Sequence, residues 1–573
     1  MKSPSKTAKI WLPLKNVIKN IFLFLKTGFK HDTPKNTLKK LAHSLLNNLD
    51  QLSLSLKNDQ QFQMNSQAML ELQRNCQLLH ADLPDSDYYT YSILIPVYKP
   101  NPSFFRKALL STLNQSARKM EVIVGFDGPQ SDSVYAVVDE LQREYKNILK
   151  SYSIDRSSGG GISRTTNYLA EKAQGRFLLL MDHDDWIRPD LLYRYEQKLQ
   201  SIENYPTKEN TILYCDEYKI NEYDQIIGQS EIRKNNEVPF PYLFINWICH
   251  CLLIPKKLWQ QMGGCRPECD FAQDYDLVLR LDLAGAQFQN IPHLLYAWRS
   301  HSQSTASNPN QKRGVQINTL KGLQNYVDQK KLNWKLEDGH LTTSCRAIPY
   351  IADVGAVHVI ISVEEDEPSL QKSIEAIKNQ KGIARRITLL THTSMEIPGC
   401  ETILVNHPGS SFNKNKAVKE SRFSKECDVL LFLNAKITLD EHAVLEMCRW
   451  IDQPHIGLVG CQLTTPHGRI LHQGIEHKPF HSNEALSWRC NELVLGAYLR
   501  VVDAIHRDCM LIKKSIFMSV NGFDEIAAPL DHQHLSLSSR LKEQKLHTFF
   551  TPYAVGIYQS DVAKGDPSSS LTL

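Results

Sequence analysis

One segment constrains the fold of this chain more than any other, because residues 177–185 read FLLLMDHDD. An apolar run of this length is typical of a buried strand in a parallel sheet. Such strands end at the edge where open α/β sheets hold their ligands. The carboxylates of Asp182, Asp184 and Asp185 would repel one another there unless a cation lies between them. Taken alone, an acidic turn in water is the simpler interpretation.

Strands and helices alternate around this segment. Apolar strands are expected at 91–97, 121–126 and 177–181, separated by helices at 103–115, 132–146 and 162–174. This order is typical of a parallel, doubly wound sheet. At 573 residues the chain is long enough for two or three domains of ordinary size.

The same pattern then starts again further along the chain. The shared features are a strand, a helix ending in Asn-Gln, and a second strand followed by four distinctive positions. They fall at 91–97, 114–115, 177–181 and 182–185 in the first copy, and at 357–363, 379–380, 429–433 and 434–437 in the second. We therefore expect an N-terminal region over 1–85, α/β domains over 86–310 and 346–573, and a connecting helix and linker over 311–345.

The N-terminal region is basic and amphipathic. Residues 1–40 hold ten lysines against one acidic residue, so the remaining chain has a net charge of −5 within the total of +4. A helix over 13–30 places its apolar residues on one face with lysines beside it, as in helices that lie on anionic membranes. The alternative is a helix packed on the protein's own body. Residues 36–80 are Leu- and Gln-rich and are also expected to be helical.

The composition of the chain indicates in which compartment it works and which classes of partner it disfavours. No run approaches the roughly 20 apolar residues that span a bilayer, and no secretory signal is recognisable. Thirteen cysteines, an odd number, indicate free thiols in a reducing cytosol. The group Cys249, Cys251, Cys265 and Cys269 with His250 does not match common zinc spacings, so buried thiols are favoured over a zinc site. The acidic body argues against nucleic acid as a partner.

Several polar positions at expected strand ends and loops can carry chemistry. Asp127 can accept hydrogen bonds from a nucleobase or ribose, although Asp-Gly is also common in turns. The loop 156–164 (RSSGGGISR) allows close backbone approach, and Arg156 and Arg164 can pair with phosphate oxygens. Asp274 begins an expected helix, where it can act as a cap or as a general base.

Taken in order, these segments resemble the inverting family 2 glycosyltransferases of the GT-A fold. Within that family the likeness is to tandem-domain enzymes that build O-antigen and related bacterial surface polysaccharides. The resemblance is dense over 90–345 and looser beyond. The motifs that carry it are Ile95-Pro96-Val97-Tyr98, Asp127, Gly161-Ile162-Ser163 with Asn167, Asp182-His183-Asp184-Asp185, Tyr214-Cys215-Asp216-Glu217, Gly263-Gly264, Gln273-Asp274-Tyr275-Asp276 and Trp298-Arg299-Ser300-His301.

The resemblance implies an α/β fold of two tandem GT-A-like domains and a role for each motif. Asp184, with Asp182 and His301, would hold Mn²⁺ or Mg²⁺ on the diphosphate of a nucleotide-sugar, and Asp274 would be the catalytic base. Donor-binding residues would be Pro96, Tyr98, Asp127, Arg156, Gly161, Arg164, Asp182, His183 and Arg299. Candidates for contacts with the donor sugar or the acceptor are Asp185, Trp186, Asp216, Glu217 and Trp298.

The implied function is metal-dependent, inverting transfer of a sugar to a growing lipid-linked saccharide, on the cytoplasmic face of the inner membrane. The second copy departs from this pattern, because Asn434, Lys436 and His534 stand opposite Asp182, Asp184 and Asp274. A protonated lysine cannot ligate a cation, so we expect a degenerate second domain; a lysine that replaces the metal as diphosphate counter-charge is the alternative.

Two other functions compete with this one. A polysaccharide polymerase would have both domains active and would use two donors. A non-catalytic scaffold would bind glycan or nucleotide without turnover, which the complete acidic set of the first domain disfavours.

Overall fold

The structure is a computed structural model that describes residues 90–116, 119–202, 205–234, 243–301, 309–341, 343–351, 355–364, 368–475, 497–526 and 532–559. The predicted helix over 13–30 and the helical region over 36–80 lie outside these residues. Within them, no helix combines the length and the apolar character needed to cross a membrane.

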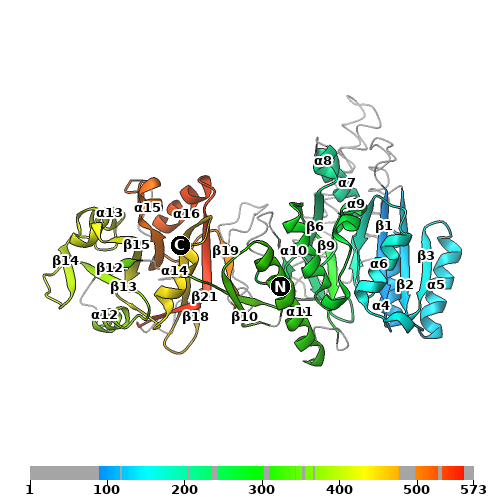
Figure 1. The fold of residues 1–573 in the computed structure, drawn as a ribbon, viewed down its shortest axis with the longest axis horizontal. Coiled ribbons are helices and arrows are strands. Elements are labelled where there is room, and N and C mark those ends of the chain that lie inside the picture. Colours follow the sequence, from blue (N-terminus) through cyan, green and yellow to red (C-terminus); the bar gives the residue numbers. More distant parts are fainter. Residues whose placement is uncertain are drawn as a thin grey trace, which may run out of the picture. The chain divides into compact units, whose positions relative to one another are not determined.

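The chain divides into two compact units, each built on its own mixed sheet (Figure 1). The first unit contains residues up to 238 together with 247–318, and the second contains 239–246 together with 319–573. Helices cover each sheet. This confirms the predicted fold class, α/β with two GT-A-like domains.

The first unit holds a nine-stranded sheet in the order β3-β2-β1-β4-β8-β6-β9-β5, with β7 paired to β6. Its elements are β1 (Tyr91–Val97), α4 (Pro102–Leu113), β2 (Met120–Asp127), α5 (Asp132–Glu144), β3 (Leu149–Ile154), the 3₁₀ turn η2 (Arg156–Ser158), α6 (Ile162–Lys172), β4 (Phe177–Leu180), β5 (Trp186–Ile187), α7 (Leu191–Ser201), α8 (Tyr205–Lys208), β6 (Thr211–Ile220), β7 (Ile226–Ile232), β8 (Leu253–Pro255), α9 (Lys256–Met262), η4 (Pro267–Cys269), α10 (Gln273–Leu283) and β9 (Gln287–Arg299).

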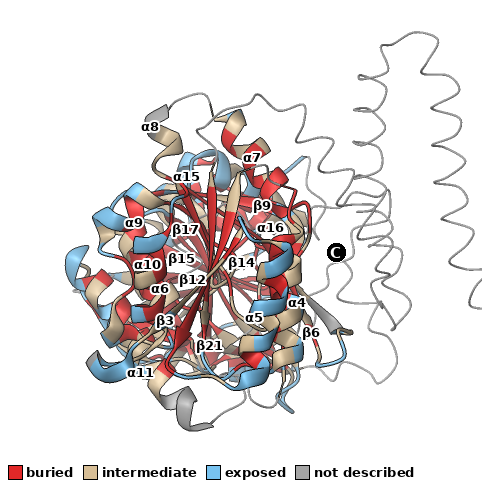
Figure 2. Cartoon of the chain, turned by 90° about the vertical axis from the view of Figure 1, so that its right-hand side faces the viewer, coloured by how far each residue is buried: buried red, intermediate tan, exposed pale blue. Residues whose placement is uncertain are grey.

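The core of this sheet explains why its strands read as continuous apolar runs. Strands β3, β2, β1 and β4 are parallel, and successive residues of β1 and β2 are buried, so both faces of these strands are covered. Buried residues, drawn red in Figure 2, gather on the central strands. Ile93, Ile95 and Val124 face a core shared with helices α4, α5 and α7. Helix α6 packs so closely on β2 that a side chain at Gly125 would meet Leu169 at 2.8 Å. The parallel strands therefore direct their carboxyl ends to one edge.

The second unit repeats the order in a ten-stranded sheet, β14-β13-β12-β15-β20-β17-β21-β16, with β18 paired to β17 and β19 to β21. Its elements are α11 (Pro309–Gln329, which begins in the first unit), β10 (Trp334–Asp338), β11 (Cys345–Pro349), β12 (Ala356–Val363), α12 (Leu370–Lys378), β13 (Ala384–Thr391), β14 (Cys400–Leu404), α13 (Ser411–Glu420), η6 (Arg422–Lys425), β15 (Cys427–Asn434), β16 (Ile437–Leu439), α14 (Ala443–Ile451), β17 (Ile456–Thr464), β18 (Ile470–His472), β19 (Arg500–Val502), β20 (Cys509–Lys513), α15 (Lys514–Ser519), α16 (Gln533–Glu543) and β21 (His547–Tyr558).

The glutamine that ends the first helix of each copy makes the same three hydrogen bonds. The Gln115 amide donates to the carbonyls of Ser111 and Arg188 and accepts from the backbone of Leu192. In the second unit, Gln380 donates to the carbonyls at 376 and 440 and accepts from the backbone at 444. The Asn-Gln echo in the sequence therefore reflects one structural device used twice.

The strand register aligns the two copies in the same way as the sequence repeat did, including the positions where the second copy lacks the acidic residues. Phe177 pairs with Pro255, and Val429 pairs with Lys513, and each partner directly precedes a helix. Counting forward from this match aligns 434 with 182 and 436 with 184. Arg280 and Arg540 bond the carbonyls of residues 262 and 520, so 534 aligns with 274.

The region predicted as a connecting helix and linker, 311–345, contains most of helix α11 and also strand β10, which pairs with β11. The Trp334 ring lies 5.7 Å from that of Trp450. This hairpin is therefore packed into the second unit, a feature that the sequence pattern did not reveal.

Candidate functional site

The acidic loop between β4 and β5 is held at the sheet edge by its last carboxylate. Asp185 is 1% exposed, accepts a hydrogen bond from the Tyr296 hydroxyl, and accepts another from the backbone N–H of Arg299 at 2.6 Å. Burial, reinforced by the charges of Asp184 and Asp182, raises the pKa of Asp185 well above its ordinary value. The prediction that Asp185 contacts a sugar is therefore corrected, because this side chain ties the loop to β9.

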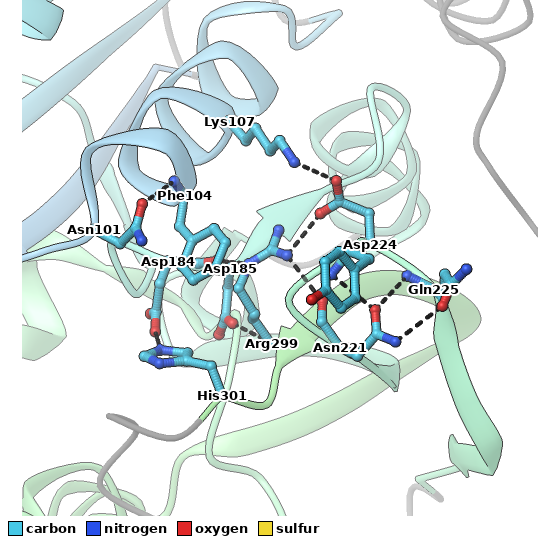
Figure 3. Close-up of polar contacts among 11 residues, drawn as sticks. Asn101, Phe104, Lys107, Asp184, Asp185, Asn221, Asp224, Gln225, Arg299 and His301 are labelled. Carbon is cyan, nitrogen blue, oxygen red and sulfur yellow. Dashed lines mark hydrogen bonds and ion pairs between the residues drawn. The ribbon is translucent and has the colours of Figure 1, made fainter.

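Two of the predicted metal ligands, Asp184 and His301, are far apart in the sequence but contact each other directly. His301, just after β9, places its Nε2 atom 2.8 Å from Oδ2 of Asp184 (Figure 3). Burial opposes ionisation of Asp184, but the hydrogen bond from His301 and the charge of His183 outweigh it and lower the pKa of Asp184. An ionised carboxylate beside an imidazole offers oxygen and nitrogen donors to a divalent cation.

Arg299 is a buried structural residue. It is 1% exposed, and its Nε atom donates to the Asp184 carbonyl at 2.7 Å. Its Nη1 atom reaches the Asn221 carbonyl at 3.1 Å and Asp224 at 2.6 Å, and the guanidinium lies 4.5 Å above the Phe104 ring (Figure 3). The predicted contact of Arg299 with a donor diphosphate is therefore corrected, since this side chain supports the acidic loop from behind.

Trp186 is likewise part of the interior. It is 8% exposed and packs in a small apolar cluster with Tyr218 and Ile220. It is therefore not placed to contact a sugar. Trp298 stays half-buried, with the Lys219 ammonium 4.3 Å above its ring and the His250 ring 4.8 Å away.

A second polar cluster, centred on His250, lies beside the loop. Ligand atoms of Asp182, Asp185 and His250 lie within 4.8 Å of one another. The Nδ1 atom of His250 is 2.9 Å from Glu217, whose carboxylate also pairs with the fully buried Lys234 at 2.9 Å. Burial and the charge of Asp184 raise the pKa of Asp182 against the opposing charge of His250. His250 and Lys234 reach Glu217 from other segments of the chain, so no sequence motif indicated that they would pair with it.

Asp216 and Glu217 serve this framework. Asp216 accepts hydrogen bonds from Asn290, the Lys234 backbone and Arg233. The charges of Lys234 and His250 overcome burial and lower the pKa of Glu217 to about 2. Both residues are 1% exposed. Their predicted contacts with a sugar are corrected, because these hydrogen bonds and ion pairs tie β6 to its neighbours.

The cysteine group considered for zinc does not assemble into a metal site. Among the described residues, the clusters able to hold a metal include Cys249 but none of Cys251, Cys265 and Cys269. These three thiols are buried, and every cysteine in the described ranges is free. The expectation of buried, free thiols is confirmed for them.

A cradle forms where β1, β2 and β3 end. The Asp127 Oδ2 atom accepts from the Gly161 backbone at 3.0 Å, and its Oδ1 atom lies 3.4 Å from Arg156 Nε without a hydrogen bond of its own. The Arg156 guanidinium lies 4.8 Å over the half-exposed Tyr98 ring. Pro96, part-buried at the end of β1, completes this edge. An unsatisfied buried oxygen beside an exposed ring suits a planar, hydrogen-bonding ligand.

Glycines shape the loop that closes the cradle. Gly159 and Gly161 have φ of +97° and +122°, which only glycine adopts readily. A side chain at Gly159 would meet the guanidinium of Arg164 at 3.4 Å, and one at Gly161 would meet Asp270 at 2.1 Å. Asp270 also accepts from the Ser163 backbone at 3.1 Å. Asp270 was not predicted from the sequence, although it stands just before α10, where an acidic side chain could have been noticed.

Asp274 and Asp276 occupy the first turn of α10 but differ in environment. Asp276 is buried between Arg266 and Arg280. Asp274 is part-buried and lies near enough to Asp182 for its charge to help raise the pKa of that carboxyl, after the larger effects of burial and Asp184. The structure thus brings Asp274, Asp182 and Asp184 to one edge of the sheet.

Comparisons with known proteins agree with this geometry. Residues 92–231 match the sequence profile described as "Glycosyl transferase family 2". Over 505 residues the chain is 23% identical to the Sinorhizobium fredii protein y4gI, covering 83% of this chain and 53% of that one. It is 22% identical to the O-antigen biosynthesis protein RfbC of Myxococcus xanthus, covering 76% of this chain and 34% of RfbC.

A third relative matches a shorter stretch of the chain. The amylovoran biosynthesis glycosyltransferase AmsE of Erwinia amylovora is 24% identical over 229 residues, covering 39% of this chain and 80% of AmsE. By contrast, the chain spans about half the length of y4gI and a third of RfbC.

The buried Lys234–Glu217 pair gives a first prediction. Lys234→Met leaves the buried Glu217 carboxylate with His250 as its remaining charged partner and should cost about 3–5 kcal/mol of unfolding free energy, measured by chemical denaturation at pH 7. Because the pKa of Glu217 is lowered from 4.5 to about 2, the pair stabilises the fold above pH 4.5, and this contribution is lost as the pH falls toward 2.

The double variant Lys234→Met/Glu217→Gln is the control, and it should recover part of that loss because no buried charge remains unpaired. A Lys234→Met protein within about 0.5 kcal/mol of wild type would contradict this account of the pair.

Proposed function

We propose, starting from the match of residues 92–231 to the family 2 glycosyltransferase profile, that the first unit transfers a sugar from a nucleotide-sugar donor. The acceptor is a growing lipid-linked saccharide in the biosynthesis of a bacterial surface polysaccharide. The names of two relatives, an O-antigen biosynthesis protein and an amylovoran biosynthesis glycosyltransferase, support this setting. One observation carries the proposal: Asp184 with His301, Asp127 with a free oxygen, and Asp274 all lie along the carboxyl edge of one sheet.

The acidic loop suits a divalent cation, Mn²⁺ or Mg²⁺. Asp184 and His301 are already paired at 2.8 Å. Burial and, after it, the charge of Asp184 raise the pKa of Asp182, a cost of ionisation that a bound cation would reduce. These three residues would hold it. When bound, the ion supplies Lewis-acid stabilisation of the departing diphosphate.

The remaining residues of the first unit bind the donor and move a proton. Tyr98 and the free Oδ1 atom of Asp127 orient the nucleotide, while Arg156 and Arg164 lie near its phosphates. Asp274 accepts the proton of the acceptor hydroxyl as that oxygen bonds to the anomeric carbon. The bond from this carbon to the diphosphate oxygen breaks on the opposite face, so the configuration inverts.

We further propose that the second unit lacks metal-dependent transfer. Asn434, Lys436 and His534 stand at the positions of Asp182, Asp184 and Asp274, as the matched strand registers and helix contacts indicate. This arrangement disfavours a polymerase with two equivalent active units.

The transfer reaction is tested by removing its carboxylates. Asp184→Ala and Asp274→Asn should each lower turnover by at least about 10²-fold, because each removes a group that acts in the reaction. Turnover is measured as release of nucleoside diphosphate over a panel of nucleotide-sugars. Asp132→Asn, an exposed carboxylate on α5, and Lys436→Ala should keep wild-type rates. Undiminished turnover in both aspartate variants would overturn the assignment.

The basic N-terminal segment has a separate role in this scheme. We propose that residues 13–30 bind the anionic cytoplasmic face of the membrane, which would bring the first unit to a lipid-linked acceptor. Deleting residues 1–35 should abolish co-sedimentation with anionic liposomes and leave transfer to a soluble acceptor unchanged. Liposome binding that survives the deletion would reject this role.

A further inference from the structure

The second unit carries a buried cation close to the positions that are acidic in the first. Lys414, on α13, is 5% exposed, and its ammonium donates to Gln533 Oε1 at 3.3 Å. Among the described residues no carboxylate lies within 4.0 Å of it. A buried ammonium with one long bond to a neutral amide has unused hydrogen-bonding capacity, which is costly unless a ligand supplies acceptors.

A second buried group nearby also lacks a partner. His534 is 5% exposed and its Nδ1 atom has no hydrogen bond. Burial, with the charges of His506 and Arg507, lowers the pKa of His534 to about 3, so the imidazole is neutral. It begins α16 beside Gln533, the residue that also bonds Lys414.

Two carboxylates act on Lys414 from a distance, Asp508 and Glu364, and Asp508 has several partners of its own. Asp508 accepts a hydrogen bond from the Tyr558 hydroxyl and another from Asn434 at 3.4 Å. His506 and Arg507 lie 3.6 and 3.7 Å from its oxygens. Arg507 is thus one cationic neighbour of Asp508, and Lys414 is another. Burial lowers the pKa of Lys414 to about 8, and the charges of Asp508 and Glu364 offset part of that shift.

The backbone at this edge also favours an anion. Helix α13 begins after Ser410 and spans ten residues, so its N-terminus carries a partial positive charge. Gln533 bonds the Gly409 carbonyl at 3.0 Å, which draws the start of α16 to the start of α13. Lys414 follows in the first turn of this helix. Lys414 and the start of α13 therefore lie beside Gln533, and His534 follows Gln533 on α16.

We propose that the second unit binds a diphosphate group without a metal ion, with Lys414 as its counter-charge and His534 as a hydrogen-bond partner. Under the proposed function, the first unit uses a metal ion to bridge its carboxylates and a diphosphate. In the second unit, the positive charge comes from the side chain of Lys414 on α13. The same group occurs in a nucleoside diphosphate and in a lipid-linked saccharide. Either source presents the oxygens that this site lacks.

The test is calorimetric titration of the full chain with inorganic pyrophosphate in EDTA at pH 7. Wild type should bind, and Lys414→Met should weaken binding about 10- to 100-fold, as expected for loss of a charge-assisted hydrogen bond. Lys416→Met is the matched control, because Lys416 lies on the same helix with a 37% exposed side chain and a surface pair to Glu420 at 3.7 Å. This control should bind like wild type.

Two further variants separate this site from the first unit and from folding defects. Asp184→Asn should lose transfer and keep pyrophosphate binding, so failure of the proposed reaction and failure of this site are distinguishable. Lys414→Met removes a buried charge at similar volume, so its Tm should be unchanged or higher. His534→Ala should weaken binding several-fold without changing the charge of the site, because the His534 imidazole is neutral at pH 7.

Competition with UDP and with a short isoprenoid diphosphate identifies the source, and preference for either supports a diphosphate site. The proposal is overturned if wild type does not bind pyrophosphate in EDTA, if Lys414→Met binds like wild type, or if Lys416→Met loses binding equally.

Discussion

A buried guanidinium holds the candidate active site together. Arg299 bonds the Asp184 carbonyl through its side chain and the Asp185 carboxylate through its backbone, and its far side is fixed by Asp224 and the Phe104 ring. With Asp185 consumed in this way, Asp184 is free to face His301 across the sheet edge. In the acidic loop, the buried Asp185 therefore fixes the loop to β9, while Asp184 is placed beside His301 as a candidate metal ligand.

The chain uses the same scaffold twice with opposite electrostatics. Both sheets share one strand order, and Gln115 and Gln380 bond the same three backbone groups in each copy. In the first copy, several carboxylates lie together at the sheet edge, an arrangement that suits a cation. In the second, a lysine and neutral histidines stand there, which suits an anion. The fold thus constrains where a ligand binds, while side chains at a few strand and helix ends decide its charge.

Much of the fold was predictable from sequence because parallel strands buried on both faces leave continuous apolar runs. The pairing of Asp184 with His301 was also predictable, since both belong to recognisable motifs. Residues whose role depends on packing were not. Arg299 and Asp216 look like ligands in a motif but are buried supports.

His250 was considered from the sequence only within the cysteine group, and the roles of Lys234 and Lys414 were not predicted, for a related reason. Each reaches its partner from a distant segment, and only the closed sheet brings the two together. The hairpin of β10 and β11 was missed because its strands are short and lie in a region that reads as a linker.

The number of Mn²⁺ ions bound per chain tests the central claim most directly. Equilibrium dialysis of the full chain with Mn²⁺ and excess UDP should give one tight site, absent in Asp184→Ala and retained in Lys436→Ala. Two equivalent sites, or one site that survives Asp184→Ala, would contradict the conclusion that the chain carries the acidic chemistry only in its first unit.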